Sequence, residues 1–207
     1  MEGLPTIWAV TGNIGAGKST VARMLAELRH ARMIDADVEA HQLYARDAGL
    51  RRELARAFGP LVLVGATEEN DCGVDVDREV LGKIVFGNPA DLARLNAIVR
   101  PKLIGRFMEK LQDLEGEVVF EGALILEWGV ESWFGRILLV TAAEETRVRR
   151  IMARSGNTLS RTEATRRVKA QMPQEEKAAR PGVVVVENDG SPAELAEKVE
   201  RLAAELR

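Results

Sequence analysis

One eight-residue stretch limits what this chain can fold into. Residues 12–19 read Gly-x-x-x-x-Gly-Lys-Ser, the pattern of a phosphate-binding loop, or P-loop. An apolar run at 6–10 precedes it, and residues 21–28 continue with helical spacing. A strand that enters a glycine-rich turn and leaves as a helix aims backbone N–H groups and the positive helix end at an anion. The pattern therefore predicts an α/β protein that binds a nucleoside triphosphate.

Each residue type in this loop suits a phosphate ligand. Glycines adopt backbone angles closed to other residues and leave room for the ligand. Lys18 can reach the β- and γ-phosphates, where we also expect it to act in catalysis, and the Ser19 hydroxyl can ligate Mg²⁺. The predicted nucleotide-binding residues are Gly12, Asn13, Gly15, Ala16, Gly17, Lys18, Ser19 and Thr20. The alternative is a glycine-rich turn followed by a chance lysine. It is disfavoured because the predicted strand, loop and helix all match the P-loop pattern.

Composition narrows the class of protein. The 207 residues can bury a full core as one domain, and a net charge of −3 gives no overall basic field for nucleic acid. The single cysteine, Cys72, excludes an intrachain disulfide and fits a reducing compartment. We find no signal-peptide pattern and no apolar run near the roughly 20 residues that cross a bilayer. We expect a cytoplasmic protein without nucleic-acid or membrane partners, and the sequence leaves monomer or small homo-oligomer open.

The order of predicted elements indicates a doubly covered parallel sheet. Apolar runs near 6–10, 31–37, 117–121, 136–140 and 182–186 alternate with helical patterns. Strands that alternate with helices behind a P-loop predict a five-stranded parallel sheet of the P-loop nucleoside-triphosphate hydrolase type, a three-layer αβα fold.

The intervening segments predict one domain with two additions. Residues 48–116 are mostly helical, with helices expected at 77–86, where Asp77 would be the capping residue, at 90–99 and at 102–114. An irregular glycine-rich connection is expected at 61–75. We interpret 48–116 as an inserted helical lobe that holds a substrate and 146–179 as a helical lid. The core is then formed by 1–47, 117–145 and 180–207.

Two groups of charged residues are candidates for chemistry. Asp35 and Asp37 end the second strand, at the sheet edge where ligands of parallel sheets bind. The alternative role for Asp37 is a helix N-cap. We favour catalysis because Asp37 is expected at the same sheet edge as the P-loop. Eight basic residues lie between Arg147 and Lys169. Any one of them alone is better explained as part of a solvated helix face, but lid arginines can stabilise the transferring phosphoryl group.

The ordered set of motifs resembles the dephospho-coenzyme A kinase family over nearly the whole chain. The matching motifs are Thr11 to Thr20, Ile34 to Asp37, Asp77-Arg78, Leu124 to Glu127, Met152 to Gly156, Arg167 to Lys177, and Glu187 to Gly190. The resemblance implies ATP-dependent phosphorylation of the ribose 3′-hydroxyl of dephospho-coenzyme A, the last step of coenzyme A synthesis.

The resemblance also implies residue roles. Asp37 would be the base or orienting group for the acceptor hydroxyl, and Mg²⁺ would bind Ser19. Lid arginines Arg147 and Arg154 would neutralise phosphoryl charge, with Arg154 in a catalytic role. The remaining implied contacts are Arg78, Leu124 and Glu127 with the acceptor, and Asn188 and Gly190 beside the adenine.

Three positions depart from the usual family pattern, and other functions compete. Ala123 replaces a proline, Arg100-Pro101 replaces His-Pro, and Arg180-Pro181 replaces Ala-Asp. The main alternative is another small-molecule kinase, acting on a nucleoside, shikimate or gluconate. A guanine-nucleotide switch would need an Asn-Lys-x-Asp motif, but the chain contains no Asn-Lys pair.

Overall fold

The computed structural model describes residues 6–67, 69–112, 114–156 and 158–206. They divide into two compact units. The first takes the chain up to Ala36 and from Leu114 onward, and the second is the stretch that begins at Asp37. The finer division into core, lobe and lid stays a prediction.

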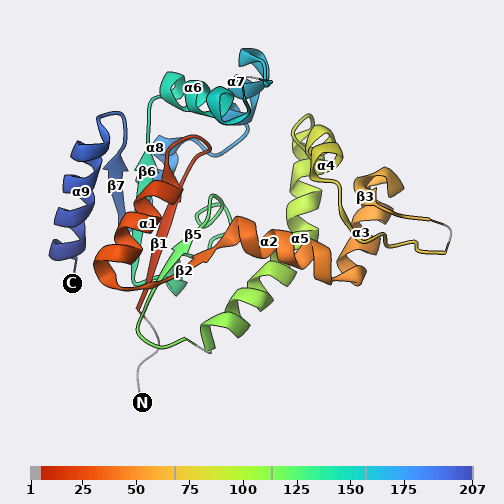
Figure 1. Cartoon of the computed structure of the whole chain (residues 1–207), viewed down its shortest axis with the longest axis horizontal. Helices are drawn as coiled ribbons and strands as arrows, with labels where there is room; N and C mark the ends of the chain where they lie inside the picture. The colour runs from red at the N-terminus through yellow and green to blue at the C-terminus, as the bar shows by residue number, and fades with distance from the viewer. Residues whose placement is uncertain (1–5, 68, 113, 157, 207) are drawn as a thin grey trace. The chain divides into compact units, whose positions relative to one another are not determined.

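The first unit is built on one parallel sheet (Figure 1). Its strands are β1 (Thr6–Gly12), β2 (Arg32–Asp35), β5 (Glu117–Glu121), β6 (Arg136–Thr141) and β7 (Val183–Glu187). They lie in the order β2-β5-β1-β6-β7, and every neighbouring pair is parallel. The predicted five-stranded parallel sheet is confirmed. The central strand is β1, so the P-loop emerges from the middle of the sheet.

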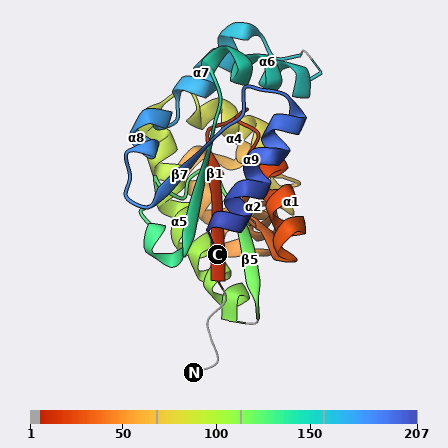
Figure 2. The same ribbon diagram turned by 90° about the vertical axis from the view of Figure 1, so that its left-hand side faces the viewer.

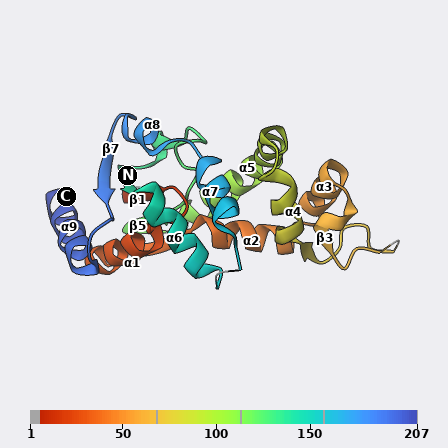
Figure 3. The ribbon, with the colours of Figure 1, turned by 90° about the horizontal axis from the view of Figure 1, so that it is seen from above.

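Helices cover both faces of this sheet. They are α1 (Lys18–Arg29), α6 (Glu144–Arg154), α7 (Arg161–Lys169), α8 (Gln174–Ala178) and α9 (Pro192–Glu205), with a short 3-10 turn, η2 (Glu131–Trp133). α1 and α9 pack together on one face, and α8 packs on β6 and β7 from the other (Figure 3). Strands buried on both faces explain the continuous apolar runs of the sequence. Trp8, Leu25, Leu138 and Val199 lie in the core between the sheet, α1 and α9. The three-layer fold is confirmed.

Glu117 joins strand to helix at the amino end of the sheet. Its carboxylate accepts hydrogen bonds from Trp8 Nε1 at 3.0 Å and from Arg29 Nε at 2.7 Å. The Arg29 guanidinium also lies over the Trp8 ring, 5.2 Å from its centroid. The hydrogen bond from Arg29 lowers the pKa of Glu117, and it outweighs the opposing effect of burial.

We expect Glu117→Gln to lower the free energy of unfolding at pH 7 by about 1–2 kcal/mol. Because the folded-state pKa of Glu117 is lowered, its stabilisation is present above the unfolded-state pKa of about 4.3 and is lost as pH falls through the folded-state value. Urea unfolding at pH 7 and near pH 3 measures this. The difference between wild type and variant should shrink at the lower pH, whereas the exposed Glu200→Gln should change little at either. An equal difference at both pH values would contradict the prediction.

The second unit is mainly helical. Its elements are α2 (Ala36–Arg46), α3 (Ala48–Phe58), η1 (Pro60–Val62), β3 (Leu63–Val64), β4 (Asp75–Val76), α4 (Arg78–Val85) and α5 (Pro89–Gln112). α5 packs against α3 and α4. Buried leucines at 50, 54 and 81 form much of the unit's interior. In the described ranges, none of the helices of either unit combines the length and apolar character needed to cross a membrane.

Two local expectations for this unit are wrong. The stretch 61–75, expected as an irregular connection, contains the antiparallel pair β3–β4. The two helices expected around Arg100-Pro101 are one helix, α5, with Pro101 inside it. A proline in a helix interior removes one backbone hydrogen bond and costs about 3 kcal/mol. Val99, Leu103 and Phe107 are all buried at four-residue spacing, so one apolar stripe runs past the proline and offsets that cost.

Candidate active site

The P-loop has the backbone geometry that its glycines allow. Gly12 and Gly17 have φ angles of 145° and 98°. A Cβ on Gly12 would meet Val140 O at 2.2 Å, and a Cβ on Gly17 would meet Asn188 Nδ2 at 2.2 Å. Any larger residue at either position would therefore collide with the sheet or with the loop that follows β7.

The start of α1 suits an anion. Gly17 is the N-cap residue, and no side chain in the described ranges caps this helix end; its first turn also carries no acidic residue. The first N–H groups of a helix lack intrahelical partners and carry the positive end of its dipole. Lys18, Ser19 and Thr20 are the first three residues of α1. The structure thus brings the predicted phosphate-binding residues together at one helix end.

Glu121 is a functional candidate that the sequence analysis did not name. It is the last residue of β5 and is 6% exposed. Its Oε1 accepts a hydrogen bond of 2.7 Å from Ser19 Oγ. β5 pairs directly with β1, and Glu121 lies opposite Val10 in that pairing. In the sequence, the signal for Glu121 is an acid at the carboxyl end of a predicted strand, which is the same signal as for Asp35.

α6 braces the P-loop through Arg150, a second residue that was not predicted. Figures 1 and 2 show α6 and α7 beyond the carboxyl ends of β1 and β6. Arg150 Nη1 donates to Gly15 O and Ala16 O, each at 3.3 Å, and Nη2 donates to Asn188 O at 2.9 Å. Because Arg150 binds backbone carbonyls of the P-loop and of the turn after β7, it holds the two segments together.

The two predicted lid arginines have different surroundings. Arg147 is 7% exposed, its Nε donates to Ala142 O at 3.1 Å, and burial lowers the pKa of its guanidinium. Its Nη1 is buried and makes no hydrogen bond with the part of the chain that is described. Arg154 is exposed at the last residue of α6. Of the two, Arg154 is the one that is open to solvent, and the phosphate role of both stays a prediction.

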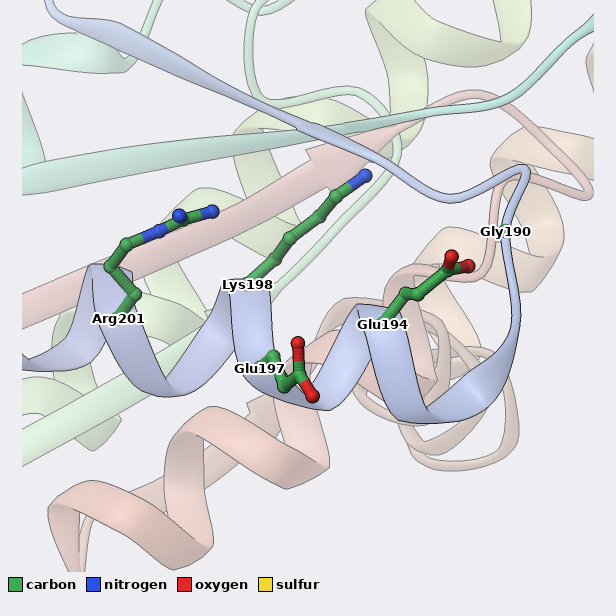
Figure 4. Close-up of a pocket in the computed structure, with 5 residues that line it drawn as sticks. All are labelled: Gly190, Glu194, Glu197, Lys198 and Arg201. Carbon is green, nitrogen blue, oxygen red and sulfur yellow. The ribbon is translucent and has the colours of Figure 1, made fainter.

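The turn after β7 holds the two residues predicted beside the adenine. Asn188 is 7% exposed and donates from Nδ2 to Ala16 O at 2.7 Å. Gly190 lies in the bend before α9, at one end of a surface pocket that runs along that helix (Figure 4). The described lining of this pocket is Gly190, Glu194, Glu197, Lys198 and Arg201. Asn188 therefore supports the P-loop directly, whereas Gly190 borders an open surface.

Glu127, predicted to bind the acceptor, forms an ion pair with a buried lysine. Its Oε1 lies 2.7 Å from Nζ of Lys177, which is fully buried on α8. Lys177 Nζ also donates to Ala123 O at 3.1 Å. Burial lowers the pKa of Lys177, although the Glu127 charge opposes this effect. Leu124 is half-buried in the same segment after β5, and the acceptor role of both residues stays a prediction.

The second unit carries the other predicted site residues. Asp37 lies in the first turn of α2, and Arg78 is the first residue of α4, whose N-cap is the predicted capping residue Asp77. Burial raises the pKa of Tyr44 to about 12; the charge of Arg78 opposes this rise and that of Asp37 adds to it. Arg78 Nη1 also contacts His41, at 3.2 Å from Nδ1. The charges of Asp37 and Arg78 thus both act on Tyr44.

Comparisons with known proteins agree with one another. The family model described as "Dephospho-CoA kinase" matches residues 6–194. A dephospho-CoA kinase of Geobacter sulfurreducens is 39% identical over 204 residues, which cover 96% of this chain and 97% of the relative. The crystal structure of TT1252 from Thermus thermophilus is 41% identical, with a TM-score of 0.75 and coverage of 99% of this chain and 100% of that one. A dephospho-CoA kinase structure from Campylobacter jejuni is 26% identical, with a TM-score of 0.57 and coverage of 99% and 98%.

Proposed function

Because the chain belongs to the dephospho-CoA kinase family, we propose that it transfers the γ-phosphoryl group of ATP to the ribose 3′-hydroxyl of dephospho-coenzyme A. Coenzyme A and ADP are the products, and the reaction is the last step of coenzyme A synthesis. The full-length family match carries this proposal, and the P-loop at the start of α1 supports it. The alternative acceptors, a nucleoside, shikimate or gluconate, are not favoured because the matching family and relatives are dephospho-CoA kinases.

The first unit supplies the groups for ATP. The amides of the P-loop and the start of α1 would bind the phosphates, and Lys18 would neutralise charge that develops on the transferring group. Arg154 and Arg147, both on α6, would stabilise the same charge. Asn188 and Gly190 would lie beside the adenine. The Asn188 side chain also donates a hydrogen bond to Ala16 O of the P-loop.

A magnesium ion fits the Ser19–Glu121 pair. Mg²⁺ prefers hard oxygen ligands and is commonly held by one or two protein oxygens together with substrate phosphates and water. Ser19 Oγ and Glu121 Oε1 lie 2.7 Å apart at the phosphate end of the sheet. When bound there, Mg²⁺ would neutralise charge on the β- and γ-phosphates. The protein's part is to hold the serine hydroxyl on α1 and the carboxylate on β5 in fixed positions.

Four residues are assigned to the acceptor. We assign Asp37 to the 3′-hydroxyl, where its carboxylate would orient the hydroxyl and accept its proton. Arg78, Leu124 and Glu127 would contact other parts of dephospho-coenzyme A. Arg78 is the cation among them, and it suits a phosphate of the acceptor because a guanidinium binds phosphate oxygens through paired hydrogen bonds.

The reaction is tested by ADP release with Mg-ATP and one acceptor at a time. Dephospho-coenzyme A, adenosine, shikimate, gluconate and no acceptor are compared, and the products are identified by mass. We expect turnover only with dephospho-coenzyme A, with coenzyme A as the product. Turnover with another acceptor, or hydrolysis that no acceptor changes, would contradict the proposal.

Glu121→Gln tests the magnesium assignment. The amide retains an oxygen but loses the charge, so we expect the Mg²⁺ concentration for half-maximal rate to rise about tenfold, roughly 1.4 kcal/mol. Initial rates across a Mg²⁺ titration at saturating ATP measure this. Glu117→Gln, at the other end of the same strand, is the matched control and should leave the Mg²⁺ requirement unchanged. The same Mg²⁺ dependence in Glu121→Gln and wild type would remove Glu121 from the metal site.

A further inference from the structure

The P-loop exchanges side-chain hydrogen bonds with the segment that follows α7. Asn13 Nδ2 donates to Met172 O at 2.9 Å, and the Ile14 backbone N–H donates to Gln171 Oε1 at 2.7 Å. The loop thus gives a side chain to the segment's backbone, and the segment gives one to the loop's backbone. Asn13 is 1% exposed, so the Asn13 side chain is shielded from water.

Apolar and backbone contacts add to this connection. The side chain of Ile14 packs against the buried cluster that joins α6 to α7. That cluster is Val148, Ile151, Ala164 and Val168. On the next residue, a Cβ on Gly15 would meet Arg147 O at 2.7 Å, so the two backbones are in contact. Together with the Arg150 hydrogen bonds, these contacts make the P-loop and the α6–α7 hairpin one packed body.

Gln171 is held in place from its other side as well. Three residues later, the Gln174 side chain accepts from Ala142 N at 3.1 Å and donates to Ala142 O at 3.0 Å. Lys177 then binds Ala123 O and Glu127. The segment 171–177 is therefore fixed at the carboxyl edge of the sheet, and the position of Gln171 does not depend on α7 alone.

We infer that Gln171 is a positioning residue for phosphoryl transfer, acting through the Ile14 amide of the P-loop. Its side-chain oxygen accepts a hydrogen bond from the Ile14 N–H, so this part of the loop keeps its shape. The amides that follow then stay aimed at the phosphates. In phosphoryl transfer the protein contributes mainly by positioning and charge neutralisation. A loop that relaxes by a fraction of an ångström therefore lowers kcat more than it lowers substrate affinity. This inference rests on the proposed function.

Two methionine substitutions in the same segment test it. Gln171→Met and Gln174→Met each replace a glutamine by a side chain of similar length without the amide. They differ in the backbone that is released, Ile14 in one and Ala142 in the other. We expect similar falls in Tm for the two variants. We also expect kcat to fall about tenfold in Gln171→Met, with KM for dephospho-coenzyme A within about twofold, while Gln174→Met keeps kcat within about twofold.

The outcome separates a positioning role from a structural one. Equal losses of kcat in both variants, or a kcat for Gln171→Met within twofold of wild type, would overturn the inference. If Gln171→Met does not fold, amide hydrogen exchange of the wild-type chain decides, because the Ile14 N–H should be protected to the same degree as the amides of α7. Exchange at the rate of an unprotected amide would overturn it. A wild-type chain that does not use dephospho-coenzyme A would instead reject the proposed function, and the exchange result would still stand.

Discussion

Lys18→Ala is expected to abolish measurable turnover, with kcat lower by about a thousandfold. Lys18 is the first residue of α1, directly after the N-cap Gly17. In a loose phosphoryl-transfer transition state, negative charge is spread over the transferring group, and a fixed ammonium offsets it without reorganisation. Alanine is the best helix former, so the variant should keep the start of α1. ADP release at saturating Mg-ATP and dephospho-coenzyme A measures the loss.

Two controls give this result its meaning. Lys83→Ala removes an exposed lysine of α4 that pairs with Glu79, and it should leave kcat unchanged. The Tm of Lys18→Ala should stay within a few degrees of wild type, which shows that the fold is intact. A kcat within tenfold of wild type would mean that Lys18 does not stabilise the transferring group, and the assignment of the phosphate site would have to be reconsidered.

The parts of the molecule that could be predicted are those encoded by neighbours in the chain. Residues 12–19 carry the P-loop pattern within a few positions, and the sheet strands are short apolar runs, with a helical segment after each of them except β5. Asp77 was recognisable as a helix cap because the cap and the amides it binds are two and three residues apart. Local spacing therefore yields the fold class and the nucleotide loop.

The contacts that complete the site join residues far apart in sequence. Ser19 and Glu121 are 102 residues apart, and Ile14 and Gln171 are 157 apart. Which acid meets Ser19 depends on β5 inserting between β2 and β1, an order that apolar runs alone do not specify. Arg150 looked like one basic residue among eight, because only packing of α6 on the P-loop distinguishes it from its neighbours. Long-range packing thus decides which of several chemically similar residues becomes functional.

Asp37→Asn is the second substitution with a large expected effect, a loss of kcat of about 10²–10⁴-fold. Asparagine has nearly the same shape and retains one oxygen acceptor, but it cannot take up the proton of the acceptor hydroxyl. In a loose transition state the bond to the incoming oxygen forms late, so the hydroxyl proton is still mostly in place and the base contributes chiefly by orientation. We therefore expect a loss nearer the lower end of that range, with KM for ATP unchanged.

Asp35→Asn is the matched control for this substitution, because it makes the same chemical change two residues earlier, at the end of β2. We expect it to lower kcat by no more than a few-fold. Single-turnover kinetics with enzyme and both substrates separate the chemical step from product release. ATP binding by Asp37→Asn should be as tight as in wild type. If the two variants lost kcat equally, the effect would come from lost negative charge at this sheet edge rather than from a base. If Asp37→Asn stayed within a few-fold of wild type, the base would have to be sought elsewhere, and phosphoryl transfer in this protein would rest on Lys18, the metal and the arginines alone.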